Sequence, residues 1–203
     1  SFGIARAGLR AWLAVAGGID VPLVLGSRTT YRRAGIGGHQ GRPLVAGDKL
    51  KLFEASAWAT HLLASLKSGG RRAVAWTARP ETMGRPAKPG VVRALRGPEC
   101  DWFSKESQQT FFSVAWRATN EADRMGVRLK GPSLDRLREG DMISSSVNAG
   151  TVQVPPAGQP IVLLPSRQSI GGYPRIAGVI SVDLGRFTQL RPGDAVTFEE
   201  TTL

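Results

Sequence analysis

Apolar and polar residues alternate in short runs along much of the chain, and this pattern predicts a protein built mainly from β-strands. Val114, Trp116 and Ala118 alternate with polar neighbours, as expected for a strand with one buried face. Residues 161–164 (IVLL) are apolar throughout and predict a strand that is buried on both faces. Short strands broken by turns are typical of a β-barrel, so we expect a mainly β fold.

The same pattern predicts further strands at residues 9–15, 91–95, 142–147, 151–154 and 178–182. Helix is expected in two short pieces only. Ser104 is placed to cap a helix that carries Phe111 and Phe112, and Asp183 to cap a single helical turn before the last strand.

Two stretches of the chain repeat the same landmarks. In residues 44–52 and 190–198 a leucine is followed three residues later by Gly-Asp and then by alternating apolar residues, and a Gly-Gly pair precedes each stretch. We therefore predict two related barrel units, the first incomplete at its N-terminus. Residues 1–55 are expected to form the C-terminal part of the first barrel, residues 56–90 a connector and residues 91–203 the second barrel.

Net charge and rare residues narrow the classes of partner. The charge of +11 favours anionic partners, but the arginines are scattered and form no basic helix, so we expect small anions or an acidic subunit rather than nucleic acid. The single Cys100 forms no internal disulfide, and His39 and His61 have no metal-ligand spacing. No apolar run approaches the ~20 residues of a membrane helix, and no leader pattern opens the chain, so we expect no membrane partner.

A glycine-rich loop covers residues 26–38. It lacks the Gly-Lys-Ser/Thr ending of a phosphate-binding loop, which favours an ordinary surface loop with a solvated His39 at its end.

The strongest candidate for a site surrounds the apolar strand at residues 161–164. Stiff proline-rich sequence precedes it and flexible Gly171-Gly172 follows it, so polar side chains are mounted at both of its rims. The Asp123-Arg124 pair, beside Gly126, has two interpretations that stay open here. It is either a surface ion pair or an arginine fork for a carboxylate or phosphate.

Five motifs in order resemble the allophanate hydrolase subunit 2 family, which includes the C-type subunits of 5-oxoprolinase, the carboxyltransferase half of urea carboxylase and an antagonist of a sporulation-kinase inhibitor. The motifs are residues 123–126 (DRMG), 153–155 (QVP), 158–161 (GQPI), 171–176 (GGYPRI) and 189–194 (QLRPGD). The resemblance covers nearly the whole chain and is weakest at residues 56–90.

The resemblance implies two cyclophilin-like β-barrels and a cytoplasmic subunit of an ATP-dependent amide or lactam hydrolase, acting on an anionic amide such as 5-oxoproline with partner subunits of the A and B types. Alternatives are a biotin-dependent carboxyltransferase component, with biotin on a separate carrier, and a non-catalytic regulatory protein. We assign catalysis to Asp123 and Tyr173. Substrate binding is assigned to Arg124, Arg128, Gln153, Gln159, Arg167, Gln168, Gly171, Gly172 and Arg175.

The chain also departs from the family pattern. Ser145 and Ser166 stand where the family commonly has Glu and Asp, and Ala122 where it has Ser. Since two carboxylates that would act as or orient a general base are missing, the sequence predicts a chain that is inert alone.

Overall fold

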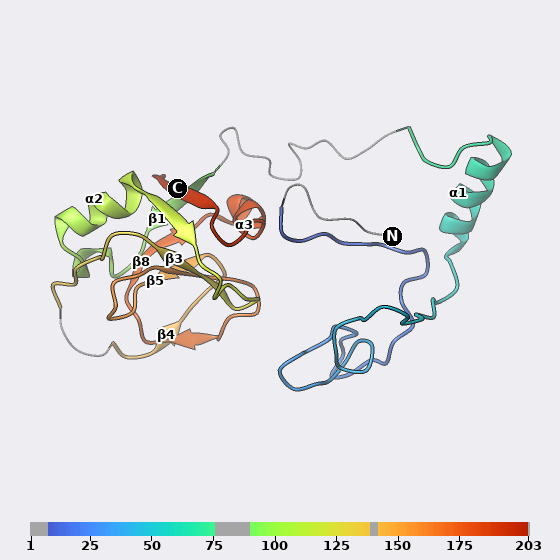
Figure 1. Ribbon diagram of the computed structural model, residues 1–203, viewed down its shortest axis with the longest axis horizontal. Helices are drawn as coiled ribbons and strands as arrows, with labels where there is room; N and C mark the ends of the chain where they lie inside the picture. Colours follow the sequence, from blue (N-terminus) through green and yellow to red (C-terminus); the bar gives the residue numbers. More distant parts are fainter. Residues whose placement is uncertain (1–7, 76–89, 139–141, 203) are drawn as a thin grey trace. The chain divides into compact units, whose positions relative to one another are not determined.

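The structure is a computed structural model that describes residues 8–75, 90–138 and 142–202 (Figure 1). The chain divides into two compact units. The barrel unit comprises Ser1–Ala11 with Ala78–Leu203, and the loop unit comprises Trp12–Thr77.

Seven strands of the barrel unit close into a barrel in the order β1-β8-β5-β6-β3-β2-β9. Their bounds are β1 Val91–Arg96, β2 Ala115–Ala118, β3 Gly126–Lys130, β5 Thr151–Gln153, β6 Ile161–Leu163, β8 Arg175–Val179 and β9 Ala195–Glu200. The β1–β9 pair is parallel and the other pairs are antiparallel. The predicted mainly β class and barrel are confirmed.

Aromatic side chains fill the barrel. Trp116, Phe111 and Phe198 are fully buried, and the ring of Phe111 stacks on that of Phe198 at 4.6 Å between centroids. The Trp116 indole Nε1 donates a hydrogen bond of 3.1 Å to the Phe111 carbonyl, so the one polar atom of the largest buried side chain is satisfied. The alternation predicted for residues 114–118 is confirmed by strand β2, with Trp116 and Ala118 inside.

Helix α2 (Lys105–Ser113) follows a short 3₁₀ turn, η2 (Cys100–Trp102). The Ser104 hydroxyl accepts a hydrogen bond of 3.1 Å from the Ser107 amide, which confirms the predicted cap. The strand predicted at residues 178–182 is wrong in its bounds, because β8 ends at Val179 and helix α3 (Ser181–Phe187) begins two residues later. Asp183 does not cap this helix; its buried carboxylate binds the backbone and side chain of Arg93.

Two very short strands, β4 (Ser145–Ser146) and β7 (Ile170–Gly171), pair with each other outside the barrel. Ser145 lies opposite Gly171 and Ser146 opposite Ile170. This small sheet replaces the longer strand predicted at residues 142–147.

Residues 8–10 belong to the barrel unit but form no strand, so the strand predicted at residues 9–15 is wrong. The reason is a side chain. The side-chain oxygen Oε1 of Gln189 accepts hydrogen bonds from the backbone amides of Leu9 and Arg10, at 2.9 and 2.8 Å. It so takes the place that a neighbouring strand would have. Arg191 also donates to the Gly8 carbonyl at 3.1 Å.

The described part of the loop unit consists of turns, isolated bridges such as Ile19 with Leu52, and helix α1 (Ala57–Ser68). The helix lies in the predicted connector and was not expected there. Ser56 caps it, accepting a hydrogen bond of 3.2 Å from Ala59. Nothing in this unit tests the predicted division at residues 55 and 90, which stays a prediction.

The two repeated Gly-Asp turns have the same geometry. The Asp48 carboxylate accepts from the Val45 amide at 2.7 Å, and that of Asp194 from the Arg191 amide at 2.8 Å. Gly47 and Gly193 both have positive φ, at 93° and 90°. The likeness ends after the turn, because residues 195–200 continue as β9 while the first copy reaches only the bridge at Leu52.

Candidate functional site

A buried glutamine organises the candidate site. The pairing of β5 with β8 shifts register between Val152 and Gln153, and such a bulge turns a side chain away from its regular direction. Gln153 is only 2% exposed, yet both ends of its amide are bonded. Its Nε2 donates to the Tyr173 carbonyl at 3.1 Å, and its Oε1 accepts from Gln168 Nε2 at 3.4 Å.

The strand β7 packs directly on this amide. A Cβ placed on Gly171 would lie 2.6 Å from Gln153 Nε2, so only a glycine fits at this position without displacement. The structure therefore brings together four residues to which the sequence assigned a site, namely Gln153, Gln168, Gly171 and Tyr173. Tyr173 is 45% exposed. Gly172 packs close to the Met142 carbonyl, since a Cβ there would lie 3.2 Å from that oxygen.

Arg175 lies beside this group, but its guanidinium is taken by an internal carboxylate. Its Nη2 is 2.5 Å from Glu99 Oε1 and its Nε is 2.6 Å from Glu99 Oε2, while Nη1 donates to the Ser146 carbonyl at 3.1 Å. Burial acts to raise the pKa of Glu99, but the hydrogen bonds and charge of Arg175 outweigh it and hold that pKa below its ordinary value. Arg175 thus fixes the sheet β4–β7 to the barrel.

Arg167 also serves the loop around it. Its Nε donates to the Val147 carbonyl at 3.1 Å and its Nη1 to the Pro165 carbonyl at 3.3 Å. The bond to Val147 joins the segment before β7 to the residue that follows β4, and both bonds occupy part of the guanidinium predicted to bind substrate.

Asp123 and Arg124 lie on an exposed turn. One oxygen of Asp123 accepts from the amides of Met125 and Gly126, at 2.7 and 3.0 Å, so its direct role is to shape this turn. The Arg124 carbonyl accepts from the Ser166 amide at 3.2 Å, which joins this turn to the segment that carries Gln168.

Arg128 and Gln159 line a hollow of about 350 Å³, whose walls include Ile161, the strand partner of Gln153, but not Gln168, Gly171 or Tyr173. The Gln159 amide binds both the N–H and the carbonyl of Gly131, at 3.0 and 3.2 Å. Arg128 pairs with Glu121 at 3.0 Å on the surface. The predicted single face that would join Arg128 and Gln159 to the residues around Gln153 stays a prediction.

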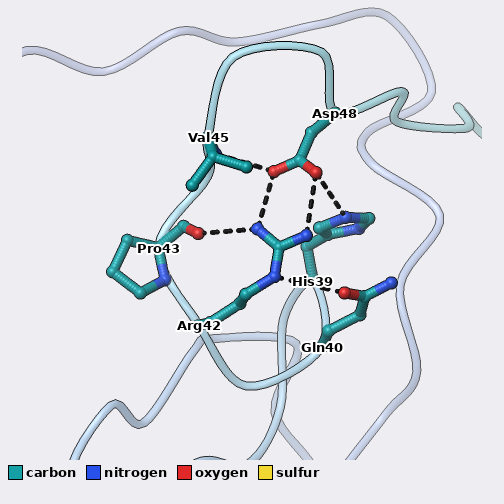
Figure 2. A network of polar contacts seen from close by, with 6 residues as sticks. All are labelled: His39, Gln40, Arg42, Pro43, Val45 and Asp48. Atoms are coloured by element: carbon teal, nitrogen blue, oxygen red, sulfur yellow. Dashed lines mark hydrogen bonds and ion pairs between the residues drawn. The ribbon is translucent and has the colours of Figure 1, made fainter.

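His39 was predicted to be solvated, but its side chain is only 22% exposed. It lies with Arg42 and Asp48 in the loop unit, and its Nε2 is 3.5 Å from Asp48 Oδ1 (Figure 2). Arg42 donates two hydrogen bonds of 2.8 Å to Asp48 and another to the Pro43 carbonyl. The Arg42 hydrogen bonds hold the pKa of Asp48 well below its usual range. This network closes the glycine-rich loop onto the Gly-Asp turn.

Across the described ranges, no three His, Cys, Asp or Glu side chains gather in a group that would hold a metal ion. Among the helices that the structure describes, none has the length and apolar character needed to span a membrane.

Sequence reasoning missed Glu99, which pairs with Arg175, and Ser145, whose buried hydroxyl makes no hydrogen bond to the described residues. No sequence signal marks Glu99, since it is 76 residues from its partner. Ser145 was singled out only as a departure from a family pattern.

The family description "carboxyltransferase domain, subdomain A and B" matches residues 1–200. The chain belongs to this family, which confirms the resemblance seen in the motifs. It is 38% identical over 196 residues to the C-type subunit of 5-oxoprolinase from Escherichia coli K12, covering 97% of this chain and 57% of that protein.

More distant relatives have names that refer to urea. Urea amidolyase of Lachancea kluyveri is 31% identical over 214 residues, which cover 94% of this chain and 11% of that protein. The crystal structure of Kluyveromyces lactis urea carboxylase matches with a TM-score of 0.75 and 26% identity, over 97% of this chain and 18% of that one. The chain thus spans little more than half the length of the 5-oxoprolinase subunits that it matches.

Proposed function

We propose that this chain is part of a cytoplasmic enzyme that opens the ring of 5-oxoproline at the expense of ATP, working in complex with subunits of the A and B types. The observation that carries the proposal is the 38% identity to a C-type subunit of 5-oxoprolinase over 97% of the chain. A second such subunit, from Haemophilus influenzae, is 37% identical over 98% of the chain.

The chemistry around Gln153 supports an amide substrate. An amide needs hydrogen-bond acceptors for its N–H and donors for its carbonyl oxygen, and side-chain amides supply both. The half-buried Gln168 and the exposed Tyr173 offer such groups beside the close backbone of Gly171. ATP is then bound at the level of the complex.

A general base is the part that this chain does not readily supply. Ser145 and Ser166 replace the two family carboxylates, and one oxygen of Asp123 is already committed to two backbone amides. We therefore propose that a partner subunit provides the base and that the chain is active only in the complex.

A second candidate function is a component of a biotin-dependent carboxyltransferase. The family description and the 31% identity to a urea amidolyase favour it. The substrate would again be an amide, urea, and the biotin would be carried on a separate protein.

The experiment that separates these functions begins with co-expression of the full protein and its A and B type partners. Size exclusion with light scattering measures whether a complex forms. The complex is then supplied with ATP and either 5-oxoproline or urea with carboxybiotin. We expect a stable complex that turns over only 5-oxoproline; turnover of urea alone supports the carboxyltransferase, and a monomer that ignores its partners contradicts both.

A further inference from the structure

Gln168 has unused hydrogen-bonding capacity. A primary amide carries two N–H donors and an acceptor oxygen. Gln168 uses one donor on Gln153 Oε1, at 3.4 Å, and its side chain makes no other hydrogen bond within the described residues. It is half-buried, and its remaining donor and its carbonyl have no hydrogen-bond partner among the described residues.

Gln153 determines how Gln168 is oriented. The Gln153 amide group cannot rotate by half a turn, because Nε2 has to donate to the Tyr173 carbonyl. The Gln153 oxygen Oε1 therefore faces Gln168. Gly171 packs close to this amide, since a Cβ at that position would lie 2.6 Å from Nε2. A buried and fully bonded amide thus presents an acceptor that selects one orientation of the Gln168 amide.

A second unused group lies next to this pair. The Ser145 hydroxyl is buried without a hydrogen-bond partner in the described structure, and Ser145 stands opposite Gly171 in the β4–β7 pairing. Buried hydroxyls are nearly always bonded, so an orphan of this kind requires an explanation. The burial of the Ser145 hydroxyl keeps it from contacting a ligand directly in this structure, so the polar group open to substrate here is the half-buried Gln168.

We infer that Gln168, oriented by Gln153, recognises the amide edge of the substrate. This inference rests on the proposed function, in which the substrate is a lactam or another cis amide. Such an amide presents its N–H and its carbonyl oxygen on one edge, and a glutamine amide presents the matching acceptor and donor. Gln153 is then a positioning residue, and Gln168 is the residue that contacts substrate.

Binding of two ligands of the same shape tests this directly. The ligands are 5-oxoproline and the lactone in which oxygen replaces the ring N–H, and their affinities for the assembled complex are measured by calorimetry without ATP. We expect the wild type to prefer the lactam by about tenfold, the value of roughly one hydrogen bond. Gln168→Leu should reduce this preference to within about twofold, whereas Gln168→Glu keeps an oxygen acceptor for the lactam N–H and should retain it.

Matched variants distinguish recognition from folding. Gln109→Leu removes an exposed glutamine of α2 and should keep the lactam preference. Gln153→Leu should lose it, whereas Val152→Ala, which weakens the same strand without touching the amide pair, should keep it. No preference in the wild type, no binding of either ligand, or a preference that survives in Gln168→Leu overturns the inference.

Turnover on the same complexes separates the two claims. ATP-dependent opening of 5-oxoproline together with an undiminished preference in Gln168→Leu contradicts this inference and leaves the proposed function intact. A preference that depends on Gln168 in a complex that never opens 5-oxoproline supports the binding role and contradicts the proposed function.

Discussion

Arg175 and Glu99 form a two-point ion pair, with Nη2 2.5 Å from Oε1 and Nε 2.6 Å from Oε2, across 76 residues of sequence. The Arg175 amide also donates to Glu99, at 3.1 Å. The side chains are 19% and 12% exposed, so this pair is largely removed from water. Its position between the barrel and the β4–β7 sheet makes it a structural contact rather than an anion site.

We predict that Glu99→Gln lowers the free energy of unfolding by about 2–3 kcal/mol, because it leaves a largely buried guanidinium without its counter-charge. Urea unfolding followed by circular dichroism measures the change. The control is Glu121→Gln at the exposed Arg128 pair, where side chains are 53% and 72% exposed and the loss should stay below about 0.5 kcal/mol. Equal losses at the two sites would contradict this interpretation.

Acid should destabilise the barrel through two carboxylates. Hydrogen bonds from Arg93 hold the pKa of Asp183 well below its usual range, and the pKa of Glu99 is also lowered, with Arg175 outweighing burial. A carboxyl group whose pKa is depressed on folding stabilises the protein above its unfolded pKa, and this contribution is lost as pH falls through the folded pKa. We therefore expect the free energy of unfolding to fall from about pH 4 downward.

Urea unfolding between about pH 6 and pH 2.5 measures this dependence. Asp183→Asn should be less stable at the upper pH and should lose less stability on acidification. If the variant shows the same acid loss as the wild type, Asp183 is not a source of the pH dependence.

Gly171→Ala should disturb the candidate site through packing alone. The added Cβ would lie 2.6 Å from Gln153 Nε2, and we expect a loss of about 1–3 kcal/mol in stability together with weaker substrate binding. Gly178→Ala, on strand β8, is the control, because its Cβ has no described neighbour within 4 Å. Thermal unfolding and the KM of the complex for 5-oxoproline report the two effects, and a silent Gly171→Ala would show that Gln153 has room to move.

Local patterns in the sequence predicted much of the barrel. Residues 91–95 and 161–164 were predicted as strands and correspond to β1 and β6, which end at Arg96 and Leu163, and the Ser104 cap was predicted from its position before a helix. Helix α1 was missed although Ser56 is an ordinary cap, because alanine and serine there were interpreted as connector. The strand at residues 9–15 failed because its first amides are bonded by Gln189, about 180 residues away.

The candidate site was predictable in its polar residues but not in their roles. Gln153 and Gln168 were assigned to the same site and are hydrogen-bonded to each other. Arg175 and Arg128, which were assigned to substrate, instead form ion pairs with Glu99 and Glu121. Chain spacing does not reveal such partners, since they come together only when the barrel closes. The bulge at Gln153, which turns the side chain inward, likewise depends on its pairing with β8.

Ser166→Asp should restore a carboxylate at an exposed position next to the segment that carries Gln168. If the loss of this acid removed general base help, worth roughly 10²–10⁴ in rate, the variant complex should turn over 5-oxoproline at least about tenfold faster. Ser166→Asn is the control of similar shape without charge. An unmodified chain that already supports full turnover would show that this position is structural.

Ser145→Glu tests the second missing carboxylate in the same turnover assay. We expect this variant to be less stable, because the Ser145 hydroxyl is buried.

The most direct test of the account is the ATP-dependent release of glutamate from 5-oxoproline by the full protein assembled with its A and B type partners. ADP and glutamate are measured together, with this protein present, omitted, or replaced by its Gln168→Leu variant. We predict turnover only when the protein is present, and a raised KM for 5-oxoproline in the variant. Full turnover by the partners alone, or turnover of urea but not of 5-oxoproline by the complete complex, would contradict the account.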